Sequence, residues 1–253
     1  MAPECPDCGG TGFRIRTTEQ GFTAAERCDC SFREQASRLL KSARIPPRYD
    51  HCLLETFEGQ EDSHREAIQI AGDWVERWPD LEFNHSLLFH GTPGIGKTHL
   101  AIGIIRQLAL HKGARVLFYE QRALLKKLQG TFDPTSAVRE SHILAPIQAA
   151  DILVLDDLGA GRTSEWARDV LHEIITHRYD HRKSMIITTN CALGDGEDDE
   201  AGEDGGAGLM GSLSLRQRLG DALMSRLYEM CRFVHLEGDD YRKGVINEQI
   251  RRV

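Results

Sequence analysis

From residue 91 to residue 98 the chain reads Gly91-Thr92-Pro93-Gly94-Ile95-Gly96-Lys97-Thr98. This run fits the pattern G-x-x-x-x-G-K-[ST], in which a glycine-rich backbone wraps a phosphate group. The preceding residues 86–90 are typical of a short buried strand, and the apolar stripe after His99 predicts a helix. A strand, a glycine loop and a helix in this order direct backbone N–H groups at an anion. A chance glycine turn explains the match poorly, because both flanks agree with the motif.

Each position of this motif has an expected role toward a nucleotide. Gly94 and Gly96 can adopt backbone angles that other residues avoid, so the phosphates can approach the chain closely. Lys97 would reach the β- and γ-phosphates, and the Thr98 hydroxyl would bind Mg²⁺. We therefore expect the run from Gly91 to His99 to hold the phosphates.

The composition is that of a soluble globular protein, with 40% hydrophobic and 28% charged residues in a chain of 253. No apolar run approaches the roughly 18 residues of a membrane helix, and the N-terminus lacks the features of a signal peptide. We expect a cytoplasmic protein without disulfides and without a membrane partner. Of the net charge of -8, residues 194–211 carry seven acidic residues and no basic one, which leaves -1 for the rest. Charge therefore neither excludes nor indicates a nucleic-acid partner.

Apolar strands and amphipathic helices alternate along the chain. The expected strands are residues 86–90, 114–119, 150–155, 184–189 and 232–236. The expected helices, besides the one after the glycine loop, are residues 31–44, 64–78, 121–130, 164–181 and 214–230. This order predicts an α/β fold with a five-stranded parallel sheet covered on both faces. Pro46 and Pro47 end the first helix, so we place a domain boundary between 1–44 and 45–253. The acidic, glycine-rich stretch 194–211 is predicted to be a disordered insertion.

Three further polar positions follow the predicted elements of the sheet. Asp156 and Asp157 end an apolar strand, where Asp156 would hold Mg²⁺ with Thr98 and Asp157 would orient or deprotonate a water. A strand-end turn is the alternative for this pair, and glutamate is more usual at the second position. Asn190 ends the next strand and could bond to a γ-phosphate or the attacking water. Arg226 could reach a neighbouring subunit's nucleotide, although its spacing alone favours an ordinary surface arginine.

In this order the elements resemble the AAA+ ATPases. More narrowly, they resemble the DnaC/IstB group of bacterial replicative helicase loaders and transposition helper ATPases. The matching stretches, besides the glycine loop, are IPPRY at 45–49, LLETF at 53–57, LVLDDLG at 153–159, SEW at 164–166, RY at 178–179, MSRL at 224–227 and GDDYR at 238–242. The resemblance implies the P-loop three-layer αβα sandwich. It also implies ATP hydrolysis in which Lys97, Asp156 and Asp157 act with Asn190 as sensor 1 and Arg226 as an intersubunit finger.

The region after Arg226 and the acidic stretch bear on this resemblance. Only 27 residues follow Arg226, too few for the helical lid of most AAA+ proteins, and the family similarly has little or none. A neighbouring subunit is then expected to complete the ATP pocket. The insertion 194–211 departs from the family pattern.

Four cysteines near the N-terminus have metal-ligand spacing. Cys5 and Cys8 form C-x2-C, and Cys28 and Cys30 form C-x-C, a set that can close a tetrahedral Zn²⁺ site. A redox C-x-x-C or unpaired structural cysteines are the alternatives. So short a segment needs the folding free energy of a metal. The stretch from Cys5 to Gly12 also matches the C-x-x-C-x-G-x-G repeat of DnaJ-type zinc domains. The chain contains only one such repeat, so we interpret the match as shared zinc-knuckle geometry. The remaining cysteines, Cys52, Cys191 and Cys231, are expected in the core.

Three functions remain open from the sequence. The first is a loader that grips a hexameric replicative helicase through residues 1–44, assembles as a homo-oligomer and places the helicase on single-stranded DNA. The N-terminal cysteines favour this reading, because they resemble those of many DnaC-like loaders. The second is a transposition helper, and the third is a nucleotide-binding adaptor without turnover. Candidate DNA contacts are Arg122, Lys126 and Lys127, for which a solvated basic face is the favoured alternative.

Overall fold

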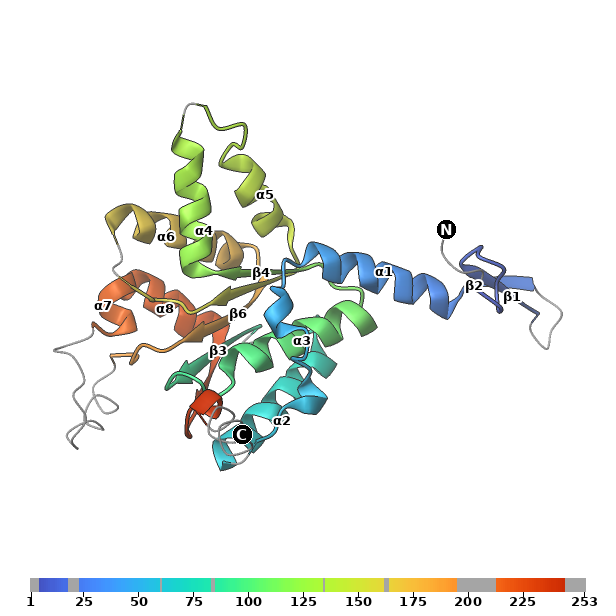
Figure 1. The fold of residues 1–253 in the computed structure, drawn as a ribbon, viewed down its shortest axis with the longest axis horizontal. Helices are drawn as coiled ribbons and strands as arrows, with labels where there is room; N and C mark the ends of the chain where they lie inside the picture. The colour runs from blue at the N-terminus through green and yellow to red at the C-terminus, as the bar shows by residue number, and fades with distance from the viewer. Residues whose placement is uncertain are drawn as a thin grey trace, which may run out of the picture.

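The computed structural model describes residues 5–17, 23–59, 61–82, 85–133, 135–161, 164–194 and 213–243. An α/β body carries a projecting arm on its N-terminal side, made of a hairpin and a long helix (Figure 1). The predicted disordered insertion lies, except for Gly194, outside the described residues. Within the described part of the chain, every helix is too short or too polar to cross a membrane.

A five-stranded parallel sheet forms the centre of the body, as the alternation of segments predicted. Its strands in spatial order are β4 (Val116–Glu120), β5 (Ile152–Asp156), β6 (Ser184–Thr189), β3 (Ser86–Gly91) and β7 (Cys231–Leu236). The strand that leads into the glycine loop, β3, therefore lies between β6 and β7. Since all five strands are parallel, their carboxyl ends meet at one edge, where such sheets bind ligands.

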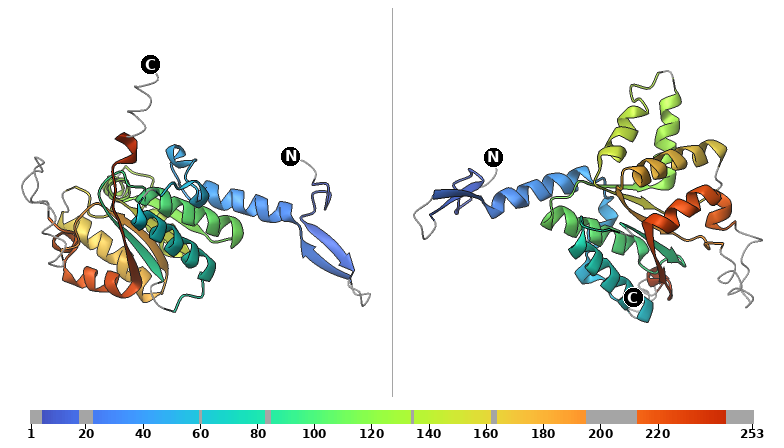
Figure 2. Two further views of the ribbon diagram at one scale, coloured as in Figure 1. Left: turned by 90° about the horizontal axis from the view of Figure 1, so that it is seen from below. Right: turned by 180° about the vertical axis from the view of Figure 1, so that it is seen from behind.

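Helices cover both faces of this sheet, and alternate strand residues enter two separate cores (Figure 2). On β3, Leu87 and Phe89 pack under α2 (Asp62–Arg77) and α3 (Lys97–His111), whereas Leu88 faces the other core. The helices of that second core are α4 (Gln121–Gln129), α5 (Ser141–Ala149), α6 (Glu165–Asp180), α7 (Leu215–Leu219) and α8 (Asp221–Met230). The predicted three-layer αβα sandwich is confirmed.

The structure differs from the predicted helices in three ways. The single helix expected over 214–230 is two helices, because Gly220 interrupts it with a φ of 87°. Helix α5 was not predicted, since Pro146 inside it breaks the usual helix pattern. Three short 3-10 helices were not predicted either: η1 (Pro47–Tyr49), η2 (Leu54–Thr56) and η3 (Gly130–Phe132).

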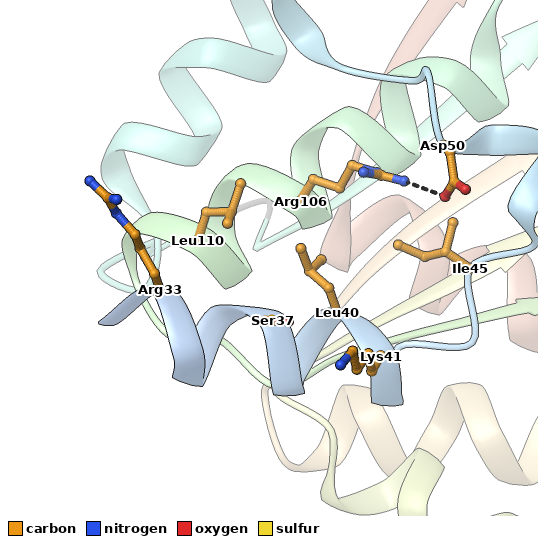
Figure 3. A pocket seen from close by; sticks show the side chains of 8 residues that line it. All are labelled: Arg33, Ser37, Leu40, Lys41, Ile45, Asp50, Arg106 and Leu110. Atoms are coloured by element: carbon orange, nitrogen blue, oxygen red, sulfur yellow. Dashed lines mark hydrogen bonds and ion pairs between the residues drawn. The ribbon is translucent and has the colours of Figure 1, made fainter. Parts of the chain in front are cut away.

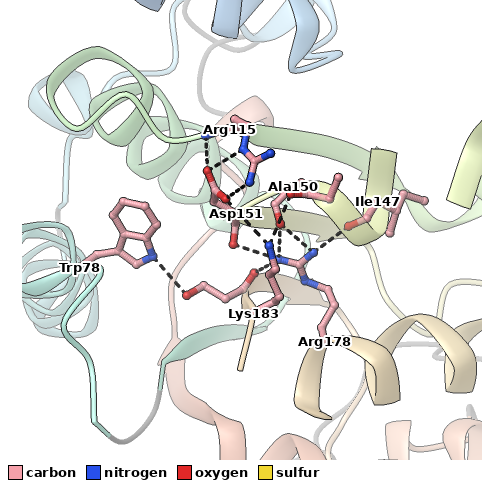
Figure 4. A network of polar contacts seen from close by, with 9 residues as sticks. Trp78, Arg115, Ile147, Ala150, Asp151, Arg178 and Lys183 are labelled. Carbon is pink, nitrogen blue, oxygen red and sulfur yellow. Dashed lines mark hydrogen bonds and ion pairs between the residues drawn. The ribbon is translucent and has the colours of Figure 1, made fainter. Parts of the chain in front are cut away.

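Arg178 of α6 fixes the amino ends of two strands of the sheet (Figure 4). Its side chain is fully buried, and its two Nη atoms donate to the carbonyls of Ile147, Ala150, Asp151 and Ser184 at 2.6–3.3 Å. Burial lowers the pKa of Arg178 to about 9, while the nearby Asp151 carboxylate opposes the shift. One guanidinium thus provides hydrogen-bond donors for buried carbonyls in the segment before β5 and at the start of β6.

The arm begins with a hairpin of β1 (Phe13–Thr17) and β2 (Thr23–Arg27) and continues as α1 (Asp29–Ser42). The last turns of α1 pack on the body, where Ala36 is buried and the Phe118 N–H donates to the Ala43 carbonyl at 2.8 Å. A groove between α1 and α3 has Leu40 and Leu110 in its lining and the Arg106–Asp50 ion pair at its edge (Figure 3). Helix α1 thus connects the hairpin to the body. The domain boundary after residue 44 stays a prediction.

Candidate nucleotide-binding site

The glycine loop lies at the carboxyl edge of the sheet, between β3 and α3, as predicted. Gly94 and Gly96 have φ values of 84° and 97°, in the region that favours glycine. Packing excludes side chains here as well. A Cβ on Gly94 would lie 1.8 Å from Oδ1 of Asp240, and one on Gly96 would lie 2.4 Å from Cε2 of Phe57. Glycine is therefore required at both positions, because the backbone has a positive φ and because Asp240 and Phe57 leave no space for a Cβ atom.

Lys97 is held inside the loop. Its side chain is 6% exposed, and Nζ donates to the carbonyls of Gly91 at 2.8 Å and Thr92 at 2.6 Å. Burial lowers the pKa of Lys97 to about 8, while the charges of Asp157 and Asp156 oppose the shift. The ammonium group can exchange these loop carbonyls for phosphate oxygens without leaving its place.

Asp156 and Thr98 meet at the position predicted for the metal. The Thr98 hydroxyl donates to Oδ1 of Asp156 at 2.8 Å, and the Thr188 hydroxyl donates to the same oxygen at 2.7 Å. Burial raises the pKa of Asp156, and the two hydroxyl bonds act against that rise. A carboxylate and a hydroxyl side by side are the oxygen donors that Mg²⁺ prefers, so this pair fits the ion.

Asp157 and Asn190 form the second polar pair at this edge. Asp157 has a φ of 58°, and its N–H donates to the Thr188 hydroxyl at 2.9 Å. Its Oδ1 accepts a bond from Nδ2 of Asn190 at 2.7 Å. The positive φ turns Asp157 away from the strand direction, leaving it partly exposed beside buried Asp156. Adjacent carboxylates therefore occupy different environments, one beside Thr98 and one facing Asn190.

The segment after β7 closes over the loop, which the sequence did not predict. The Tyr241 N–H donates to the Gly94 carbonyl at 3.2 Å, and the Thr92 hydroxyl donates to the Gly238 carbonyl at 3.4 Å. The charge of Arg242 contributes to the lowered pKa of Lys97. The motif at 238–242 was part of the family resemblance. The pairing of β7 with β3 brings it to the loop.

The remaining residues of the predicted loop contribute differently. The Ile95 side chain is buried in the core, so only its backbone faces the loop. The His99 ring lies against the segment around η2, with Nε2 2.8 Å from the Leu53 carbonyl and its centroid 5.3 Å from that of Phe57. His99 thus anchors this N-terminal segment to α3. Its ring contacts Leu53 and Phe57.

Arg226 lies on α8, away from the polar pairs above. Its Nη1 donates to the Ala222 carbonyl at 3.0 Å, and its guanidinium lies 5.9 Å from the ring centroid of Tyr179. The Tyr179 hydroxyl donates to Glu229 at 2.6 Å. These contacts place Arg226 on the surface formed by α6 and α8, so a role at a neighbour's nucleotide stays a prediction.

The four N-terminal cysteines come together although β1 and β2 separate them. Their sulfur atoms all lie within 4.8 Å of one another, with Cys5 to Cys28 at 3.8 Å and Cys8 to Cys30 at 3.3 Å. Sulfurs of a tetrahedral zinc site, about 2.3 Å from the metal, lie about 3.8 Å apart. The cluster therefore fits Zn²⁺. All seven cysteines are free thiols, and of the other three, Cys52 and Cys231 are buried and Cys191 is partly buried.

The basic candidates on α4 are exposed to solvent. Arg122, Lys126 and Lys127 lie on one helix, and the aromatic pair Phe132 and Trp166 lies close to its end. The two rings meet edge to face at 5.5 Å, and Phe132 is 59% exposed. The structure thus adds one exposed aromatic ring, Phe132, beside the partly buried Trp166, which the sequence did not reveal.

Comparison with known proteins agrees with this geometry. The profile of the IstB-like ATP binding proteins matches residues 23–248. The replicative helicase loader DnaC of Buchnera aphidicola subsp. Schizaphis graminum is 27% identical over 216 residues, covering 84% of this chain and 78% of the loader. DnaC of Escherichia coli K12 is 27% identical over 169 residues, covering 63% of this chain and 66% of that protein.

Solved structures give the same fold. The crystal structure of a DnaC helicase loader superposes with a TM-score of 0.63 at 31% identity, covering 76% of this chain and all of that one. The crystal structure of DnaI has a TM-score of 0.56 at 22% identity, covering 78% of this chain and 94% of that one, which shows the shared fold. Since the family profile covers most of the chain and the DnaC structure superposes on it, this chain belongs to the IstB-like ATP-binding proteins and has the AAA+ P-loop fold.

Proposed function

We propose that this protein hydrolyses ATP to load a replicative DNA helicase onto single-stranded DNA. The observation that carries the proposal is the pair of adjacent contacts Thr98–Asp156 and Asn190–Asp157. The first contact lies where Mg²⁺ would bind and the second where the attacking water would be oriented, both at one strand end beside the glycine loop. Likeness to DnaC over most of the chain supports the loading role.

The residues of the site divide the work of hydrolysis. Lys97 holds the phosphates, and Thr98 with Asp156 would hold Mg²⁺, which neutralises phosphate charge when bound. Asp157, held by Asn190, would orient the attacking water and accept its proton. Arg226 on the outer surface of α8 would complete the pocket of a neighbouring subunit, which requires a homo-oligomer.

The hairpin at the tip of the arm supports a docking role. Phe13 and Ile15 of β1 are 51% and 76% exposed, and Phe32 in the first turn of α1, next to the hairpin, is 49% exposed. Large apolar side chains are costly to expose on so small a module and mark surfaces that a partner covers. Because α1 holds this hairpin away from the sheet, it can engage the helicase while the body binds ATP and DNA (Figure 2).

The surface around α4 supports the DNA-binding role. The three basic side chains of this helix can contact phosphates without regard to sequence. The exposed Phe132 ring offers a stacking platform of the kind that binds unpaired bases. Together they favour a single strand over a duplex, whose bases are already stacked.

Two measurements test the proposal. ATP turnover is compared with and without single-stranded DNA, and capture of the cognate replicative helicase is compared with and without ATP. Ile15→Asp should abolish capture, whereas Arg16→Ala, on the neighbouring position that faces the other side of β1, should preserve it. Absent helicase capture by the unaltered protein would refute the loading role. Absent turnover with oligomer and DNA present would leave a nucleotide-binding adaptor.

A transposition helper is the second candidate, because the chain matches the profile of the IstB-like ATP binding proteins. The resemblance of the sequence extends to transposition helper ATPases of this group as well as to helicase loaders. This function predicts turnover stimulated by duplex rather than single-stranded DNA, and activation of a transposase without helicase capture. The same two assays therefore separate the candidates.

A further inference from the structure

A second group of metal-ligating side chains, apart from the four N-terminal cysteines, lies against the first turn of α3. His51 and Cys52 stand between η1 and η2, and His99 is the third residue of α3. The Cys52 sulfur and one ring nitrogen of each histidine all lie within 4.8 Å of one another. The hydrolysis described above uses neither His51 nor Cys52.

The spacing of these donor atoms suits a tetrahedral metal ion. Nε2 of His51 lies 3.7 Å from Sγ of Cys52. In a tetrahedral zinc site, with bonds of about 2.3 Å to sulfur and about 2.0 Å to nitrogen, two such atoms lie about 3.6 Å apart. A hydrogen bond between a thiol and an imidazole gives a similar distance, but it joins only two groups. Here a third donor, from His99, comes from a different element of the fold.

Other contacts direct the His99 ring at this group. Its Nε2 lies 2.8 Å from the Leu53 carbonyl, and its ring meets that of His51 edge to face at 6.0 Å. The ring therefore points at the segment that carries the other two donors. A neutral imidazole has one nitrogen with a free lone pair, so each of the two rings can offer one ligand to a metal.

The exposure and the chemistry of the donors fit an exchangeable ion. Cys52 is 2% exposed, whereas His51 is exposed and His99 is half-buried, so the group lies at the surface on the His51 side. Imidazole and thiolate donors suit zinc, whereas Mg²⁺ prefers oxygen donors. Three protein ligands leave the fourth position of a tetrahedral ion to water.

We propose that His51, Cys52 and His99 bind one Zn²⁺ ion, which fastens the segment before η2 to the first turn of α3. The thiol proton leaves when Cys52 binds the ion. With one thiolate instead of four, this site should hold zinc less tightly than the N-terminal cluster, so it fills when metal is added and empties on dialysis. The site does not depend on the proposed hydrolysis of ATP.

Titration of the full chain with Co²⁺ tests the site. The N-terminal cluster is first filled with one equivalent of Zn²⁺, which thiolates select. The unaltered protein should then bind one equivalent of Co²⁺, with the visible absorption of a tetrahedral ion and the charge-transfer band of a thiolate ligand. Cys52→Ser should lose the charge-transfer band. His51→Ala should weaken cobalt binding by about tenfold or more, because even an outer partner of a metal ligand contributes that much.

His111 and Cys191 supply matched controls. His111 is an exposed histidine at the other end of α3, and Cys191 is a partly buried thiol. Neither belongs to a metal-ligating group within the described part of the chain. His111→Ala and Cys191→Ser should therefore bind Co²⁺ as the unaltered protein does. Since His51 is exposed, His51→Ala is expected to fold even if Cys52→Ser does not.

Melting in added zinc gives a second readout, because an ion stabilises the state that binds it. Zinc in excess of the N-terminal cluster should raise the melting temperature of the unaltered protein and of both controls by more than that of His51→Ala. The proposal is overturned if the zinc-loaded protein binds no cobalt. It is also overturned if His51→Ala and Cys52→Ser bind cobalt as tightly as the unaltered protein. Absent ATP binding would refute the nucleotide site and leave this one standing.

Discussion

Each edge of the central sheet buries a cationic side chain, and the two edges use it differently. At the carboxyl edge, Lys97 contacts two carbonyls of its own loop, and burial lowers its pKa to about 8. At the amino edge, Arg178 contacts four carbonyls from two segments, and burial lowers its pKa to about 9. A ligand can replace the carbonyls that Lys97 contacts. The carbonyls that Arg178 contacts belong to the fold itself, so its hydrogen bonds stabilise the sheet.

The chemistry of the two side chains matches this division. A guanidinium has five N–H donors in a fixed plane, which suits several carbonyls at fixed positions. An ammonium group is a compact charge on a flexible stem, which can follow a phosphate as it binds. A buried charge near a strand end is therefore not by itself a sign of function. The groups that it contacts decide whether it serves a ligand or the fold.

Lys97→Ala should give the largest effect on function. We expect ATP affinity to fall about a hundredfold or more, because the loop loses the cation that would contact the phosphates. The melting temperature should change little, since only two loop carbonyls lose a partner. Isothermal titration with ATP and calorimetric melting measure both, and unchanged ATP affinity would refute the site.

Asp157→Asn and Arg226→Ala should spare ATP binding and remove turnover. The expected loss is about a hundredfold or more for the water-orienting group and about a thousandfold for the finger. If Arg226 acts on a neighbour, mixing the two variants should restore some activity, because one pocket in the mixture has both groups. Absence of rescue at every mixing ratio would remove the intersubunit role.

Arg178→Met should reverse the pattern seen with Lys97. Removing the guanidinium leaves buried carbonyls at the amino edge without partners, so the free energy of unfolding should fall by about 3 kcal/mol or more. The ATP affinity of the folded protein should stay within about twofold of its original value. Urea unfolding measures the first quantity, and a large change in ATP affinity at full folding would contradict the separation of the two edges.

Loss of metal should affect the arm and spare both edges of the sheet. Cys8→Ser is expected to abolish zinc binding and to speed hydrogen exchange across β1 and β2 without changing ATP affinity. Cys191→Ser, outside the cluster, is the control and should retain zinc. Zinc content by mass spectrometry decides between them, and full zinc retention in Cys8→Ser would exclude the predicted site.

The smallest effect expected is a pH dependence at the carboxyl edge. The pKa of Lys97 in the folded protein, about 8, lies below its ordinary value of 10.5. As the pH rises through 8, the free protein loses this proton, and an anionic ligand favours its return. ATP affinity should therefore fall by about tenfold from pH 7.5 to 9.5, with proton uptake on binding. Lys97→Arg, which stays charged, should show no such uptake in calorimetry.

Much of the nucleotide site followed from residue patterns. Lys97, Thr98 and the acidic pair lie in short motifs whose spacing reflects one local unit, a strand with its terminal loop. The five strands were predicted to within two residues at each end because apolar runs bounded by turns mark them clearly. Helix α5 and the exposed hairpin had no such pattern, since Pro146 interrupts one and little of the other is buried.

By itself the sequence determined the α/β class, the phosphate loop, the acidic strand end and the four cysteines with metal spacing, because each depends on neighbours along the chain. Only the tertiary structure decided that 238–242 closes over the loop and that Asp157 faces Asn190. The same holds for Arg178, which supports the sheet, and for His51 and Cys52, which meet His99 of α3. These contacts join segments far apart in sequence. They form when parallel strands bring their ends to one edge, which local spacing does not encode.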